Sequence, residues 1–322
     1  MTRIGIRLTG LHLLLTYQCN YECDHCFVWG GPSQQGVMTL SQVRDVYRQA
    51  QELGTVDWIY LEGGEPFLYY PIMVQAAREA AALGFRVGVL SNNYWATTVE
   101  DAVEWLRPLA DLVQDLTIST DLFHCNEVMS AHARNALEAA RQLGIPAGTI
   151  VCEVPEGAPG YPAQPQGESV DAHQNAGDAH QNAGAIMFKG RAVAKLVDRI
   201  LIRGVARRPW QEFTECPHEK LDDPGRVHVD HLGNLHLCQG LTMGSLFERP
   251  LVEIVDSYAP HAHPVVGPLL AGGPAALVER YDLPHAENYV DACHLCYEAR
   301  VMLRERFPDV LGPGQMYGEG LN

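Results

Sequence analysis

Apolar and polar positions follow two alternating patterns over the first two thirds of the chain. Short, nearly continuous apolar runs, typical of buried parallel strands, are each followed by a longer segment with helical spacing. The strand-like runs lie at residues 11–17, 58–66, 85–93, 115–121 and 146–154, and the helix-like segments at residues 41–54, 71–84, 97–106 and 127–144. Five such runs in unbroken alternation predict a parallel sheet with crossover helices.

A Pro/Gly-rich stretch interrupts this alternation after the fifth unit. It is followed by the heptapeptide DAHQNAG, which occurs twice in tandem at residues 171–177 and 178–184. We interpret the pair as a duplicated flexible insert and not as a metal site, because neither His173 nor His180 has a cysteine or a fixed helical spacing beside it. Residues 185–204 then predict a sixth strand with its helix.

The composition changes after Gly204, where segments become short and Pro and Gly become frequent. We therefore expect the rest of the chain to form a small domain that is held together by something other than a large core. The predicted domains are residues 1–205 and 206–322.

Composition and charge narrow the class of protein. The chain has 322 residues, 47% of them hydrophobic, which is enough to bury a full core. The formal net charge of −16 is spread along the chain without a Lys/Arg cluster, so we expect no nucleic-acid partner. Because there is no run of about 18 uncharged apolar residues and no export signal, we expect a cytoplasmic protein without a membrane partner.

Nine cysteines are the most informative feature of the composition. An odd count without an export signal favours reduced thiols over a disulfide framework, and hence metal binding or redox chemistry. Seven of them form two groups, namely Cys19, Cys23 and Cys26 near the start and Cys216, Cys238, Cys293 and Cys296 near the end.

The first group supplies three thiols from a single loop. At this spacing Cys19, Cys23 and Cys26 can all turn inward and hold three corners of a cubane iron–sulfur cluster, which leaves the fourth iron open to a reactive ligand. The alternatives are three plain reduced cysteines or a zinc site completed by His25. Zinc loops usually pair two CxxC knuckles, however, and the next cysteine lies about a hundred residues away.

The chain here resembles the radical S-adenosylmethionine (radical SAM) superfamily. The resemblance rests on the CxxxCxxC loop after the first strand and on the GGEP motif after the second, which is Gly63, Gly64, Glu65 and Pro66. It covers roughly residues 11–202 and implies an α/β fold, a partial (β/α)6 TIM-like barrel with its site at the carboxy-terminal ends of the strands.

The resemblance also implies a 4Fe-4S cluster and S-adenosylmethionine (SAM) as cofactors. Gly63 and Gly64 would let the backbone approach the methionine part of SAM, and Glu65 would accept a charge-assisted hydrogen bond from its ammonium. The alternative for GGEP alone is an ordinary strand-to-helix turn.

Four further positions match places where the family contacts the adenosine of SAM. His25 stands where an aromatic residue commonly touches adenine, and a planar ring suits stacking. Ser119 and Asp121 match the ribose-contacting place after the fourth strand, and Asn92 ends the third strand beside it. A capping role is the alternative for Asn92, Ser119 and Asp121.

The implied reaction begins when an electron donor such as a flavodoxin or ferredoxin reduces the cluster. The cluster then cleaves SAM to a 5′-deoxyadenosyl radical, which abstracts hydrogen from an unactivated carbon of the substrate. The protein's part is to aim one C–H bond and to exclude water.

The second group, Cys216, Cys238, Cys293 and Cys296, suggests one metal unit in the carboxy-terminal domain. Zinc and a four-iron cluster both accept four thiolates, so spacing alone leaves the two open. The pattern is similar to the twitch domain, a shortened SPASM domain, which implies an α+β domain with one auxiliary 4Fe-4S cluster. With four ligands, that cluster would accept an electron from a substrate radical; with three, its open iron could anchor substrate.

Two cysteines remain. Cys125 follows the ribose-contacting turn and is a candidate hydrogen-atom donor to a substrate radical, with a buried apolar role as the alternative. Cys152 lies within a predicted core strand, where we expect it to serve packing alone.

Three functions stay open at this point. The first is a radical SAM enzyme that oxidises or rearranges a small molecule, and the second is a maturase that modifies a ribosomally made peptide. The second is disfavoured because such maturases often carry a leader-binding domain, and the first strand begins near Leu11. The third is a metal-stabilised binding or scaffold protein without turnover.

Overall fold

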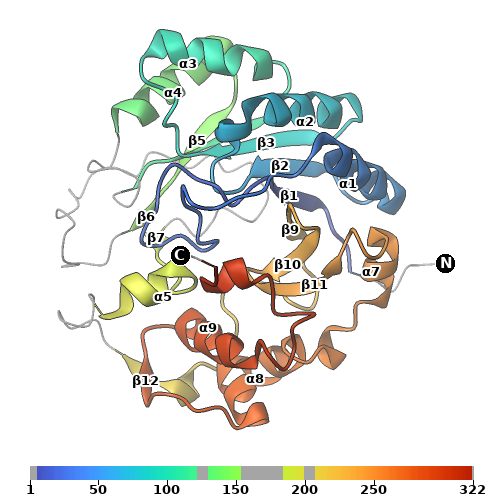
Figure 1. Cartoon of the computed structure of the whole chain (residues 1–322), viewed down its shortest axis with the longest axis vertical. Helices are drawn as coiled ribbons and strands as arrows, with labels where there is room; N and C mark the ends of the chain where they lie inside the picture. The colour runs from blue at the N-terminus through green and yellow to red at the C-terminus, as the bar shows by residue number, and fades with distance from the viewer. Residues whose placement is uncertain (1–5, 122–129, 154–183, 199–206, 321–322) are drawn as a thin grey trace.

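The computed structural model describes residues 6–121, 130–153, 184–198 and 207–320, and Figure 1 shows their arrangement. One eight-stranded sheet runs through the molecule in the order β11-β10-β9-β1-β2-β3-β4-β5. Its strands are β1 (Gly10–Leu14), β2 (Trp58–Glu62), β3 (Arg86–Ser91), β4 (Asp115–Ser119), β5 (Ala147–Ile150), β9 (Arg226–Asp230), β10 (Asn234–Cys238) and β11 (Leu241–Ser245). The strands from β9 to β5 are parallel, and β10 and β11 are antiparallel.

Helices separate the parallel strands, as the alternating pattern predicts. They are α1 (Leu40–Leu53), α2 (Tyr70–Ala82), α3 (Val99–Leu106) and α4 (Ala131–Leu143). Local sequence explains their ends: the Thr39 hydroxyl caps α1 with Gln42 in a capping box, and Gly54 ends the helix in the left-handed conformation. The predicted partial barrel is therefore confirmed by its strands and its crossover helices.

The sixth barrel strand is short. Strand β6 (Cys152–Glu153) continues the fifth strand after a break, and β7 (Gly184–Ala185) pairs with it in parallel. Helix α5 (Arg191–Lys195) follows, as predicted for this segment. The rest of the predicted sixth helix, the DAHQNAG repeats up to residue 183 and the start of the predicted helix at 127–144 lie outside the described residues.

The carboxy-terminal region continues the sheet of the barrel. Strand β9 pairs in parallel with β1, with Leu11 opposite Val227, and a hairpin of β9 and β10 follows. The remaining helices and strands are β8 (Arg208–Pro209), α7 (Leu251–Ser257), α8 (Val266–Tyr281), β12 (Asn288–Tyr289) and α9 (Ala292–Leu303). The boundary that we predict at residue 205 remains a prediction.

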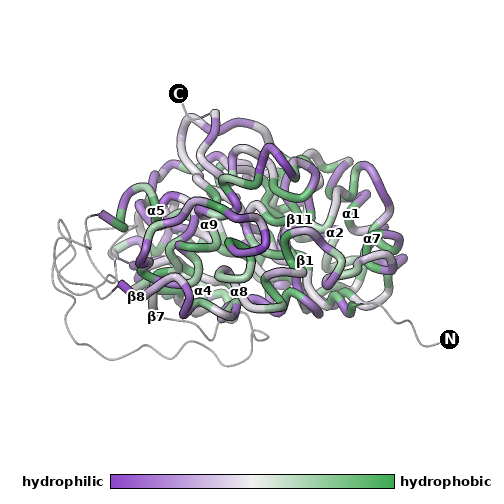
Figure 2. The backbone as a smooth tube through the Cα atoms, turned by 90° about the horizontal axis from the view of Figure 1, so that it is seen from below, coloured by the Kyte–Doolittle hydropathy of each residue, from purple (hydrophilic) through white to green (hydrophobic). Residues whose placement is uncertain are grey.

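The core does not end at that boundary. One cluster of buried apolar residues includes Leu13 and Ile59 of the barrel together with Leu235 and Leu277 of the carboxy-terminal region. The expectation that this region lacks a large core is therefore wrong, because its apolar residues pack against the barrel. Figure 2 shows hydrophobic segments (green) within the body of the molecule. No helix in the described ranges is long and apolar enough to cross a membrane.

The buried carboxylate of Asp230 joins the hairpin to the barrel. It accepts hydrogen bonds from the Tyr17 hydroxyl at 2.7 Å, from the backbone N–H groups of Leu232 and Asn234 at 2.9 Å each, and contacts the ring of His236 at 3.1 Å. Burial opposes the charge, but these hydrogen bonds hold the pKa of Asp230 at about 2. The hairpin is thereby fixed to the chain that leads into the cysteine loop.

We predict that Asp230→Asn destabilises the fold by about 2–3 kcal/mol, because an amide NH₂ replaces one acceptor oxygen and faces the buried donors. Urea unfolding under anaerobic conditions measures the change. The exposed Asp111→Asn is the matched control, and an equal loss of stability in both variants would contradict this role for Asp230.

Candidate functional site

The cysteine loop leaves the sheet after β1 and closes on itself. The Cys19 N–H donates to the carbonyl of Gly31 at 3.1 Å, and the Gly31 N–H donates to the carbonyl of Tyr17 at 3.3 Å. Burial raises the pKa of the Cys19 thiol to about 12. Burial, followed by the neighbouring charges of Cys26 and Cys19, raises the pKa of Cys23. The predicted trio of thiols is therefore brought together within one partly buried loop.

Hydrogen-bond donors point at two of these sulfurs. The backbone N–H of Tyr21 and the side-chain amide of Asn92 lie 3.4 and 3.5 Å from Cys19 Sγ, and the N–H of Gly30 lies 3.2 Å from Cys26 Sγ. Such donors stabilise thiolates that ligate metal and tune the potential of iron–sulfur clusters. The donor set thus fits a cluster held by three cysteines.

The GGEP turn is locked against the chain that enters the loop. The N–H of Gly64 donates to the carbonyl of Thr16 at 2.7 Å, and the N–H of Glu65 donates to the carbonyl of Gln18 at 2.9 Å. A Cβ atom on Gly63 would lie 2.4 Å from the Thr16 oxygen, and one on Gly64 would lie 2.1 Å from the Gln18 oxygen. Contact between the two motifs thus demands glycine, a reason that the sequence analysis did not supply.

Glu65 is fully buried at the start of a 3₁₀ turn (Pro66–Tyr69). Its carboxylate accepts hydrogen bonds from the Phe67 N–H at 3.1 Å, the Ser91 hydroxyl at 2.9 Å and the Asn92 N–H at 2.8 Å. A carboxylate has about four acceptor positions, and these bonds fix its orientation at the end of β3. Its contact with the SAM ammonium stays a prediction.

Two of the residues predicted to contact adenosine, His25 and Asp121, meet at a second point. His25 Nε2 lies 3.8 Å from Asp121 Oδ2, and the same oxygen accepts the backbone N–H of Cys152 at 3.2 Å. Ser119 is buried at the end of β4, where its carbonyl accepts the side-chain amide of Asn93 at 3.0 Å.

Cys152 belongs to this group, although the sequence analysis assigned it to packing alone. Its sulfur, a ring nitrogen of His25 and a carboxylate oxygen of Asp121 all lie within 4.8 Å of one another. Burial, and then the charge of Asp121, raises the pKa of this thiol to about 12. The other candidate thiol, Cys125, lies outside the described residues.

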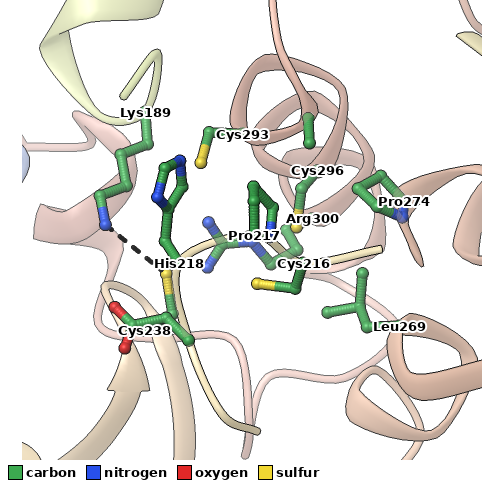
Figure 3. A pocket seen from close by; sticks show the side chains of 12 residues that line it. Lys189, Cys216, Pro217, His218, Cys238, Leu269, Pro274, Cys293, Cys296 and Arg300 are labelled. Atoms are coloured by element: carbon green, nitrogen blue, oxygen red, sulfur yellow. Dashed lines mark hydrogen bonds between the residues drawn. The ribbon is translucent and has the colours of Figure 1, made fainter. Parts of the chain in front are cut away.

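The second cysteine group lines one pocket, shown in Figure 3. Cys216 follows the 3₁₀ turn Trp210–Glu212, Cys238 ends β10, and Cys293 and Cys296 lie in the first turns of α9. The structure therefore gathers four thiols from three separate chain segments.

The chemistry of this pocket fits a metal unit. Burial raises the pKa of Cys296 to about 11 and raises that of Cys293 well above its usual range. Buried thiols so close together become thiolates only when positive charge is supplied among them. Zinc and a four-iron cluster both meet that requirement.

Two buried cations beside these thiols escaped the sequence analysis. Lys189 Nζ lies 3.9 Å from Cys238 Sγ, and Arg300 donates to the carbonyl of Gln239 at 2.6 Å. Burial opposes the charge of Lys189, but Cys238 and other nearby anionic groups raise its pKa. No local pattern signals Lys189, which approaches the pocket only through the tertiary fold. Arg300 lies four residues after Cys296 on α9, and this helical spacing could have indicated it.

A further buried cluster lies on the neighbouring strands β9, β1 and β2. The carboxylate of Glu62 is 2.9 Å from His12 Nδ1 and 3.2 Å from His228 Nε2, and the ring of Tyr60 stacks on His12 at 4.4 Å. Burial lowers the pKa of His228 to about 4, against the opposing pull of Glu62. His228 is therefore neutral at pH 7.

Comparison with known proteins finds a family match over part of the chain. The family profile described as the Radical SAM superfamily matches residues 13–153, which hold both the CxxxCxxC loop and the GGEP turn. This part of the chain therefore matches a radical SAM domain. The resemblance predicted for this part of the chain is confirmed, and the matched span ends before the sixth strand.

Several relatives share part of this domain. The chain is 28% identical over 129 residues to YydG, a Bacillus subtilis (strain 168) protein named for peptide biosynthesis, with 40% of each chain covered. It is 31% identical over 107 residues to a Pyrococcus furiosus protein named for modifying the cofactor of a tungsten-containing aldehyde ferredoxin oxidoreductase, covering 33% of this chain and 28% of the relative. The chain thus spans less than half the length of either relative.

One solved structure that this chain is similar to is that of SuiB from Streptococcus suis bound to S-adenosylmethionine. The TM-score is 0.43 at 11% identity, covering 85% of this chain and 74% of SuiB.

The neutral state of His228 gives a prediction for acid stability. An unfolded histidine with a pKa of 6.5 takes up a proton as the pH falls, whereas folded His228 does so only near pH 4, so stability is lost across this interval. Replacing His228 by Gln keeps an N–H donor for Glu62 but removes the titration. Between pH 7 and 5 we expect the wild type to lose about 2 kcal/mol more than His228→Gln.

Anaerobic urea unfolding at the two pH values measures this difference, and the exposed His261→Gln serves as the control. If His228→Gln and wild type show the same pH dependence, His228 is not the group responsible.

Proposed function

We propose that this chain is a radical SAM enzyme that abstracts hydrogen from an unactivated C–H bond. The observation that carries the proposal is the contact between the GGEP turn and the chain that leads directly into the three-thiol loop, within the span that matches the radical SAM family. Cys19, Cys23 and Cys26 would hold a 4Fe-4S cluster. When bound and reduced, that cluster supplies the electron that cleaves SAM to a 5′-deoxyadenosyl radical.

The chain's own residues hold the loop in the required shape. Arg191 donates from its guanidinium to the carbonyls of Cys23 at 3.0 Å and Gly30 at 2.7 Å, and from its backbone to the carbonyl of Cys26 at 3.0 Å. Gly190 precedes it with φ +60°, and a Cβ there would lie 2.7 Å from the Phe27 oxygen. The segment after the sixth strand thus holds the cysteine loop through hydrogen bonds and close backbone contact.

SAM would bind across the carboxy-terminal ends of the strands. In this proposal Glu65 receives the ammonium, His25 lies along the adenine, and Asp121 with Ser119 holds the ribose. Glu65 and Asp121 are buried and already oriented by hydrogen bonds, which lowers the cost of ordering them when SAM binds. Asn92 connects the GGEP turn to the cysteine loop. Its backbone N–H donates to the Glu65 carboxylate, and its side-chain amide donates to Cys19 Sγ.

For the second cysteine group we propose an auxiliary 4Fe-4S cluster that accepts an electron from the substrate radical. Four converging thiols with buried cations beside them support it. The division of the chain into a partial barrel and a twitch/SPASM-like domain is part of the same proposal. A flavodoxin or ferredoxin is the proposed electron donor.

The substrate that we favour is a peptide. Its support is the similarity of the radical SAM domain to a Bacillus subtilis protein named for peptide biosynthesis. The small-molecule substrate predicted from sequence is the second candidate, supported by similarity to the Pyrococcus furiosus cofactor-modifying protein. The third function, a scaffold without turnover, differs from both in that it predicts no cleavage of SAM.

Anaerobic reconstitution with iron and sulfide tests the two-cluster arrangement. We expect about eight irons per wild-type chain, and about four in each of two variants, one with the first cysteine group changed to Ala and one with the second. On reduction with SAM, only chains that keep the first group should form 5′-deoxyadenosine. A wild type that forms none would favour the scaffold, and zinc in the second group would remove the auxiliary cluster.

The role of Glu65 has a separate test. Glu65→Gln keeps the shape of the side chain but removes the charge, and loss of a charge-assisted hydrogen bond should weaken SAM binding about tenfold or more. Calorimetric titration of the reconstituted protein with SAM measures the dissociation constant. The exposed Glu52→Gln is the control, and equal affinities in the two variants would refute the assignment.

A further inference from the structure

A short segment after the sixth strand touches both cysteine groups. Arg191 binds the carbonyls of the first loop, whereas Lys189, two residues earlier, points its ammonium at Cys238 of the second group. The backbone N–H of Phe188 also donates to Asp291, the N-cap of the helix that carries Cys293, at 3.1 Å. Hydrogen bonds thus fix the backbone on both sides of Lys189. They hold its ammonium at the pocket of the second cysteine group.

Two cations in this pocket are almost completely buried, Lys189 with 3% and Arg300 with 1% of their surface exposed. Glu219 also lines this pocket and helps to raise the pKa of Lys189, but its carboxylate pairs with Arg226 at 3.7 Å. Among the residues that the structure describes, neither Lys189 nor Arg300 has a carboxylate within ion-pair distance of its own. Arg300 Nε is buried and has no hydrogen-bond partner there. Buried charges that lack a counter-ion are costly, so the pocket is built for an anionic occupant.

A zinc ion and a 4Fe-4S cluster are the two candidate occupants, and they differ in the hydrogen-bond acceptors that they offer. Four thiolates around a divalent ion carry a net double negative charge, and four thiolates on a 4Fe-4S cluster are anionic as well. The cluster in addition offers bridging sulfides, which accept hydrogen bonds, whereas a zinc ion offers none. Such a sulfide would add an acceptor for Arg300 Nε, a buried donor that has no partner among the described residues.

We propose that Lys189 is the counter-charge of the auxiliary cluster and raises its reduction potential. The inference rests on the proposed auxiliary cluster. Reduction adds one negative charge to the cluster, and a cation beside Cys238 in a dry pocket stabilises the reduced form more than the oxidised form. Lys189 is thus a positioning and tuning residue that makes the cluster a better electron acceptor.

The test isolates the auxiliary cluster by changing Cys19, Cys23 and Cys26 to Ala in the full chain. In this background, an EPR-monitored redox titration measures the midpoint potential with Lys189, with Lys189→Met and with Lys189→Arg. We expect Lys189→Met to lower the equilibrium constant for reduction about tenfold, a downward shift of about 59 mV for a one-electron couple. Lys189→Arg should restore the potential. Lys195→Met, at an exposed lysine of the helix α5 that follows, is the control and should leave the potential unchanged.

The outcomes separate the inference from the proposed function. If the background chain binds zinc or no iron, the auxiliary cluster itself is refuted and the inference falls with it. If it binds about four irons and Lys189→Met has the same potential as Lys195→Met, the cluster stands and the role of Lys189 is overturned. If Lys189→Met loses iron that Lys189→Arg retains, the positive charge is needed to hold the cluster, which supports the inference.

Discussion

The close contact between the GGEP turn and the chain entering the cysteine loop is the constraint on which the site depends. At Gly63 and Gly64 two backbones approach too closely for any Cβ atom, and hydrogen bonds to Thr16 and Gln18 fix their register. Because Cys19 follows directly, the first thiol is placed by the same contact. The two motifs are thus one structural unit that only looks like two in the sequence.

Backbone pairing and side-chain contacts also link the barrel to the carboxy-terminal region. The sheet passes from β1 into β9 without interruption, and a segment from Phe188 to Arg191 reaches both cysteine groups. Near the end of the chain, the side chain of Gln315 donates to the carbonyls of Val28 and Trp29, which follow the last cysteine of the loop. The loop is therefore supported by the barrel, by the segment after the sixth strand and by the carboxy-terminal region together.

Much of this arrangement could be predicted from local patterns. Apolar runs with turn residues located the first five strands, and cysteine spacing grouped seven thiols correctly, since all seven lie in two compact sites. What could not be predicted depends on distant packing. Lys189 carries no motif, and Cys152 meets Asp121, 31 residues earlier in the chain, only through the fold. The shared core was missed because many short segments looked too small to bury one, although they bury their apolar faces against the barrel.

The central claim is that the first cysteine group leaves one iron open to SAM. The most direct measurement is the EPR spectrum of the reduced protein in which Cys216, Cys238, Cys293 and Cys296 are changed to Ala, recorded with and without SAM. Coordination of SAM to the open iron predicts a clear change in the spectrum when SAM is added. An identical spectrum in the presence of saturating SAM would contradict the account.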